Sequence, residues 1–72
     1  MESTIQKISK DGLQISLMNG SLWRLANIGD ITKSALWYPT QRIKIEENGE
    51  GEYSLINLDT SEPDEIRVSR VL

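Results

Sequence analysis

The chain has 72 residues, which suits one domain and is near the lower limit for a single hydrophobic core. It holds 8 Lys and Arg against 11 Asp and Glu, a formal net charge of −3, and contains neither cysteine nor histidine. These absences exclude disulfides, thiolate metal sites, the usual zinc ligands and the usual general base near neutral pH. We therefore expect no metal, no cofactor and no enzymatic activity. Because the chain is acidic, we also expect no nucleic-acid partner, since nucleic-acid-binding proteins usually carry a basic surface.

Neither a membrane-spanning segment nor a secretory signal is expected from the hydropathy pattern. No apolar run approaches the 18 or so residues that a membrane helix needs, and the first eight residues lack the apolar stretch of a signal peptide. We expect a cytoplasmic protein that does not contact the membrane. Asn19-Gly20-Ser21 fits the glycosylation sequon, but Asn-Gly is interpreted here as a hairpin turn.

Turn signals recur at short, regular intervals: Asp11-Gly12, Asn19-Gly20, Ile28-Gly29-Asp30, Asn48-Gly49 and the segment around Pro63. The segments between them are short and rich in β-branched and aromatic residues, a pattern typical of a β-sandwich or barrel. The best helical candidate is a single turn at residues 30–37, capped by Asp30 and ended by Pro39. We predict one all-β domain over residues 1–72, a closed or nearly closed barrel of five or six short antiparallel strands.

The first two hairpins can be registered from their turns. Two-residue loops at Asp11-Gly12 and at Asn19-Gly20, the second of type I′, fix which residues face each other. The predicted pairs are Ile8–Ile15, Ile5–Met18, Leu17–Leu22 and Ser16–Trp23. One face of this meander then holds the main core: Ile8, Leu13, Ile15, Leu17 and Leu22. The other face collects Ile5, Met18, Trp23 and Leu25, and must be covered by bending into a barrel (the preferred solution), by a loop or by another subunit.

A third hairpin joins residues 42–46 to residues 52–58. A five-residue loop sets Ile45 beside Tyr53 and Ile43 beside Leu55, whereas a two-residue loop at Asn48-Gly49 sets Ile45 against Glu52. We prefer the first register because it keeps the apolar pairs together. A last strand, with Ile66, Val68 and Val71, is expected to close the sheet.

No group of residues carries a catalytic signature. The carboxylates lack calcium-ligand spacing, the hydroxyls have no histidine to activate them, and the glycines form no phosphate loop. Among the aromatic residues, Trp23 and Tyr53 are expected in the core. We predict a candidate partner surface at Trp37, Tyr38 and Pro39 together with Arg24; the alternative is that Trp37 plugs one end of the barrel. At least one of the two adjacent rings should be exposed, because side chains alternate along an extended segment.

Several strand patterns resemble those of small bacterial proteins of unknown activity. Those proteins carry a Gly-Ser-x-Trp strand, a later Trp, a Val-x-Val strand and a Tyr-x-Leu-x-Asn-x-Asp-Thr-like strand. The counterparts in this chain are Gly20-Ser21-x-Trp23, Trp37, Ile43-Lys44-Ile45 and Tyr53-x-Leu55-x-Asn57-x-Asp59-Thr60. The chain departs from the pattern at Pro39-Thr40-Gln41, where a Gly-Asp pair is typical. The resemblance implies a small SH3-like β-barrel and no particular activity.

The function expected from these features is that of a non-enzymatic binding or assembly module, acting on a protein partner or by self-association. Reactive groups are absent, and small barrels of this kind work mainly through their surfaces. The alternative is a nucleic-acid-binding barrel of cold-shock or Sm type. It requires a contiguous basic face around Arg42, Lys44 and Arg24, with an exposed Trp37 between the charges.

Overall fold

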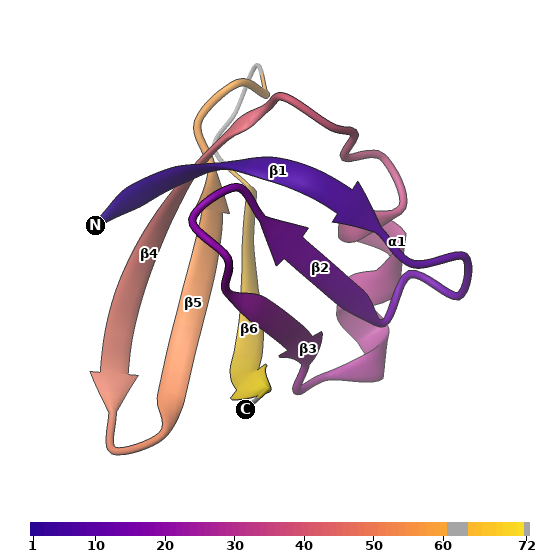
Figure 1. Ribbon diagram of the computed structural model, residues 1–72. Coiled ribbons are helices and arrows are strands. Elements are labelled where there is room, and N and C mark those ends of the chain that lie inside the picture. The colour runs from indigo at the N-terminus through magenta and orange to yellow at the C-terminus, as the bar shows by residue number, and fades with distance from the viewer. Residues whose placement is uncertain (61–63, 72) are drawn as a thin grey trace.

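The computed structural model describes residues 1–60 and 64–71 and shows a closed barrel of six antiparallel strands (Figure 1). In chain order the elements are β1 (Glu2–Ile8), β2 (Gln14–Leu17), β3 (Leu22–Leu25), η1 (Ile28–Asp30), α1 (Ile31–Ser34), β4 (Arg42–Gly49), β5 (Glu52–Asn57) and β6 (Asp64–Val71). Around the barrel the order is β1-β2-β3-β6-β5-β4, with β4 returning to β1. The predicted all-β barrel is confirmed, while the turn predicted around Pro63 lies outside the described residues.

A helical turn lies between β3 and β4, as predicted, but Asp30 does not cap it. Asn27 performs that role, because its Oδ1 accepts a hydrogen bond from the Gly29 N–H at 3.0 Å. The Asp30 carboxylate instead accepts from the backbone N–H of Arg67 at 3.1 Å. The prediction was wrong because this carboxylate joins the helical segment to β6. The α-helix also ends earlier than residue 37, at Ser34.

The β2–β3 register differs by one residue from the prediction, so the pairs Leu17–Leu22 and Ser16–Trp23 were wrong. The observed pairs are Ser16–Leu22 and Ile15–Trp23. The turn is a three-residue loop in which the Leu17 N–H donates to the Ser21 carbonyl at 2.9 Å. Within it only Gly20 has a positive φ, of 90°, whereas a type I′ turn needs two such residues. This single extra residue turns Trp23 into the barrel, where it is 2 % exposed, and Leu22 outward.

A bulge in β1 changes the predicted register of the β1–β2 hairpin. The predicted pair Ile8–Ile15 is observed, but the register shifts between Ile5 and Lys7, so that Ile5 faces Leu17 rather than Met18. Ile5 therefore joins the core, and Met18 is 64 % exposed. With Ile5, Trp23 and Leu25 all inside the barrel, the second apolar face that the sequence suggested does not exist.

The β4–β5 hairpin turns at Glu50-Gly51, and both predicted registers were wrong. Ile45 faces Leu55 and Ile43 faces Asn57. Gly51 adopts a φ of 75° at the turn, and the register shifts again just before it, between Glu47 and Gly49. Because the preferred prediction erred by an even number of residues, Ile43 and Ile45 still point inward. The strand predicted last, β6, pairs with both β3 and β5 and closes the barrel.

The register can be tested by comparing two leucines of the β2–β3 hairpin. Leu17 is fully buried and Leu22 is half-buried on the outer face. We expect Leu17→Ala to lower the free energy of unfolding by about 2–5 kcal/mol, from lost burial and the cavity left behind. Leu22→Ala should cost less than half as much in the same urea titration. Equal losses would contradict the observed register.

A second test concerns the ion pair between Arg42, at the start of β4, and Asp59, two residues after the end of β5. Asp59 accepts hydrogen bonds from Arg42 Nε at 2.9 Å, Nη2 at 2.8 Å and the backbone N–H at 2.8 Å. The Arg42 side chain is the main cause of a lowered Asp59 pKa in the folded state. The contribution of the pair to stability is therefore present above about pH 4 and is lost as the pH falls below the lowered pKa.

We accordingly expect Asp59→Asn to destabilise the protein modestly at pH 7 and to flatten the acid-side fall of the unfolding free energy. Urea titrations at several pH values between about 2 and 7 measure both effects. Glu50→Gln, which removes a carboxylate from the β4–β5 turn, is the control and should leave the acid-side fall in place. A fall of wild-type size in Asp59→Asn would show that this pair does not cause it.

Candidate binding surface at the barrel mouth

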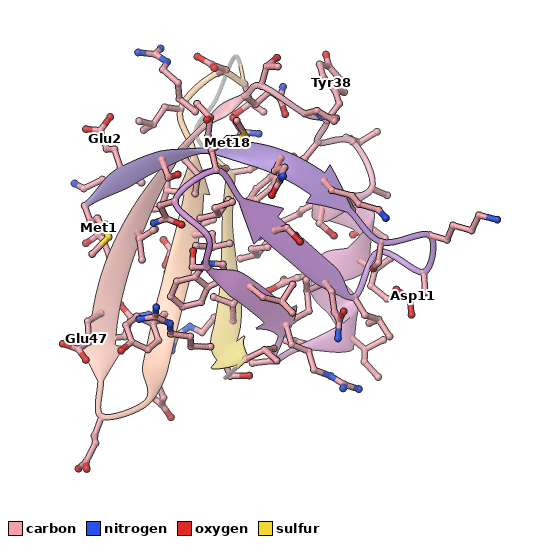
Figure 2. The ribbon with its side chains drawn as sticks, viewed as in Figure 1. Met1, Glu2, Asp11, Met18, Tyr38 and Glu47 are labelled. Carbon is pink, nitrogen blue, oxygen red and sulfur yellow. The ribbon has the colours of Figure 1, made fainter. Side chains whose placement is uncertain are left out.

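The segment predicted as a partner surface lies in the loop between α1 and β4. Trp37 is 4 % exposed and belongs to the core, whereas Tyr38 is 62 % exposed and points away from the barrel (Figure 2). The loop is held by buried amides, since Gln41 Oε1 accepts from the Tyr38 N–H at 3.0 Å and from Asn57 Nδ2 at 2.8 Å. The prediction that one of the two rings is exposed is confirmed. Trp37 packs as a plug, as in the alternative.

Arg24 is not brought together with that segment. It is exposed on the outer face of β3, where it lies between Gln14 on β2 and Ser69 on β6. Among the described residues, no hydrogen bond, ion pair or ring contact joins Arg24 to residues 37–39. The four predicted residues therefore do not form one surface.

A different surface lies at the open end of the barrel, between the β4–β5 hairpin and the β2–β3 turn. We call it the mouth slot. It is a depression of about 300 Å³, and the residues that line it are Met1, Asn19, Ser21, Trp23, Ile45, Glu47, Tyr53 and Arg70. Met1 and Glu47 are seen on this side of the molecule in Figure 2. Its size is at the lower end of the range for small-ligand pockets.

Two aromatic rings form the floor of the mouth slot. Trp23 and Tyr53 are in edge-to-face contact, with ring centroids 5.0 Å apart and planes inclined at 67°. Trp23 Nε1 donates to Ser21 Oγ at 2.7 Å, and Ser21 Oγ in turn donates to Asn19 Oδ1 at 2.5 Å. The indole N–H is thus satisfied by the turn that precedes β3, which fixes the ring without a solvent contact.

Two opposite charges stand on the walls of the slot. The Arg70 guanidinium lies over the Trp23 ring, 5.9 Å from its centroid, close enough for a cation–π interaction. Glu47 stands on β4, across the hairpin from Tyr53. In the described part of the chain neither charge has a hydrogen-bonded or ion-paired partner. Both therefore remain available to a ligand.

Sequence analysis placed Trp23 and Tyr53 inside the barrel but did not single out Glu47 or Arg70. A signal for them exists, because inward-facing residues recur with a period of two. Glu47 follows Ile43 and Ile45 at this spacing on β4, and Arg70 follows Ile66 and Val68 on β6. Charged residues that keep the inward period past the last apolar position mark the end of a barrel.

The described residues, 1–60 and 64–71, contain no group of three His, Cys, Asp or Glu side chains that could hold a metal ion. Within the same residues, no helix is long and apolar enough to cross a membrane. No family model matches the chain, no curated protein matches it in sequence, and no solved structure matches it significantly.

The roles of Trp37 and Tyr38 can be separated by single substitutions. We expect Trp37→Ala to lower the free energy of unfolding by about 3–5 kcal/mol, most of the margin of so small a domain. Tyr38→Ala should change it by no more than about 0.5 kcal/mol, because the ring is exposed. Urea titration followed by circular dichroism measures both. A large loss in Tyr38→Ala would show that its ring packs on the barrel.

Proposed function

We propose that the protein is a non-enzymatic protein-binding module whose mouth slot takes a short segment of a partner. The observation that carries this proposal is the rigid aromatic pair Trp23–Tyr53 with an uncommitted cation, Arg70, and an uncommitted carboxylate, Glu47, beside it. An apolar side chain of the partner packs on the partly exposed Tyr53 ring, which the buried Trp23 holds in place. The partner's backbone carbonyl and N–H groups meet Arg70 and Glu47, respectively, which gives an orientation as well as affinity.

The composition of the slot supports a peptide rather than a polyanion. Tryptophan, tyrosine and arginine are the residues that most often dominate binding energy at protein interfaces. A cytoplasmic location in a bacterial cell belongs to the same proposal.

The nucleic-acid alternative loses the feature on which it depended. Trp37 is buried, and Arg42 is engaged by Asp59 at 2.8 Å. Arg24 is on β3 and Lys44 on β4, two strands that are three places apart in the six-strand ring. These side chains therefore cannot track one phosphate backbone together with an exposed tryptophan.

The test is selection of peptides from a random library displayed on phage, with the immobilised protein as bait. We expect the selected peptides to bind in the micromolar range and to shift the Trp23 indole resonance in nuclear magnetic resonance spectra. Arg70→Met, which removes the charge and keeps an unbranched side chain, should weaken binding at least about fivefold.

Arg67→Met is the matched control, because Arg67 is on the same strand with its side chain on the outer face of the barrel. It should bind the selected peptides as the wild type does. Failure to enrich any peptide, or equal binding by Arg70→Met and the wild type, would refute the mouth slot as the binding site.

A further inference from the structure

Charge is segregated on the outside of the barrel, although the chain as a whole is acidic. We call the outer face of residues 7–8 of β1, of β2 and β3, and of residues 67–71 of β6 the basic face. Glu2, at the other end of β1, faces Lys44 of β4 and lies outside it. The register places these outward residues on it: Lys7, Gln14, Ser16, Leu22, Arg24, Arg67, Ser69 and Val71. Three are cations and none is a carboxylate, and Lys10 adds a fourth cation from the β1–β2 turn.

A groove of about 490 Å³ crosses this face, lined by Lys7, Lys10, Gln14 and Leu22 among others. The ammonium groups of Lys7 and Lys10 have no hydrogen-bonded or ion-paired partner within the described residues. The nearby carboxylate of Asp11 is already occupied, since it accepts from Ser9 Oγ at 2.6 Å and from the Leu13 N–H at 3.0 Å. Asp11 keeps its negative charge in the same turn, so the groove presents two ammonium groups without a direct partner beside an apolar side chain, with one carboxylate next to them.

The complementary feature is on the same chain. The β4–β5 hairpin projects past the rest of the barrel (Figure 1). We call residues 46–52 the acidic tip, because these seven residues contain Glu46, Glu47, Glu50 and Glu52 and no base. Throughout the described chain none of the four carboxylates has a hydrogen-bonded or ion-paired partner. An exposed hairpin with one sign of charge is complementary to the groove in charge.

The two features cannot meet within one molecule. In the ring β1-β2-β3-β6-β5-β4, β2 and β5 are three places apart, on opposite sides of the barrel. Figure 2 shows the same separation, with Asp11 beside the groove at one side and Glu47 near the tip at the other. They can meet only between copies, and contact between two different surfaces on opposite sides does not close as a two-fold dimer.

We propose that the acidic tip of one copy docks in the basic groove of the next, which gives head-to-tail assemblies of more than two copies. A second copy suits the groove better than nucleic acid does, because no aromatic ring is present among the outward residues of the basic face for bases to stack on. Leu22 and Ile8 offer apolar contact that a peptide hairpin can use. The acidic tip shares Glu47 with the wall of the mouth slot, but the groove is a different surface. The variants below leave Glu47 unchanged, so the two proposals can fail separately.

The first experiment is analytical ultracentrifugation of the wild type over a range of concentrations up to about 1 mM, at low and at high salt. We expect the average mass to rise with concentration at about 20 mM salt without saturating at a dimer. At about 0.5 M salt the association constant should be lower by a factor of about ten or more. A mass that stays monomeric at low salt, or that saturates at a dimer, would overturn the proposal.

The second experiment is a charge swap. The tip variant carries Glu50→Lys and Glu52→Lys, and the groove variant carries Lys7→Glu and Lys10→Glu; all four positions are exposed, so both variants should fold. Each alone should associate at least about tenfold more weakly than the wild type. A mixture of the two should associate again, because the basic tip of one variant now fits the acidic groove of the other. Failure of the mixture to associate would contradict docking of tip into groove.

Two controls separate this contact from other causes. Glu2→Lys with Glu65→Lys changes the net charge as the tip variant does but leaves the tip intact, and it should still associate. If it loses association as the tip variant does, net charge rather than the tip is responsible and the proposal fails.

The second control is a nucleic acid. An oligothymidylate of about 12 nucleotides should bind no better than in the weak non-specific range. Tight binding that is lost in the groove variant would assign the basic face to nucleic acid instead.

Discussion

The hydrogen bond from the Trp23 indole to Ser21 joins the register of the barrel to the chemistry of its mouth. A buried indole N–H without a partner costs about 1–3 kcal/mol, a large part of the stability of a domain of this size. Asn19 Oδ1 accepts from both the N–H and the hydroxyl of Ser21, which leaves the hydroxyl oxygen free to accept from Trp23. The turn that sets the register thus also satisfies the largest side chain that the register buries.

The consequences of this arrangement extend to both faces of the sheet. With Trp23 inside, its ring meets Tyr53 of β5, across the intervening strand β6, and provides the surface on which Arg70 lies. With Leu22 outside, the basic face gains an apolar side chain next to its lysines. A slip of one residue would exchange these two side chains, which would leave the mouth slot without its floor and place an indole among the cations.

Sequence patterns were sufficient to locate the elements but not to determine which residues of neighbouring strands pair. Turn residues and β-branched segments located six strands and the helical turn, because those signals are local. The two hairpin registers failed because Asn19-Gly20 suits a two-residue loop and a three-residue loop alike, and Asn48-Gly49 precedes the turn at Glu50-Gly51 instead of forming it. The β1 bulge between Ile5 and Lys7 has no comparable signal.

The candidate surfaces follow from unequal strand lengths, which is why they could not be predicted from residue types alone. β4 and β6 have eight residues each, whereas β2 and β3 have four. In a closed barrel the longer strands must extend past the shorter ones, and their inward residues then leave the core for solvent. Glu47 lies on such an extension, because β4 pairs with β1 only at residues 42–44, and an apolar side chain there would be exposed. Arg70 instead faces Trp23 within the part of β6 that pairs with β3. The excess length of β4 also carries the β4–β5 turn away from the barrel, where four carboxylates can remain solvated without partners. Strand length therefore generates the Glu47 wall of the slot and the projecting acidic hairpin, and both provide charge that the fold itself does not use.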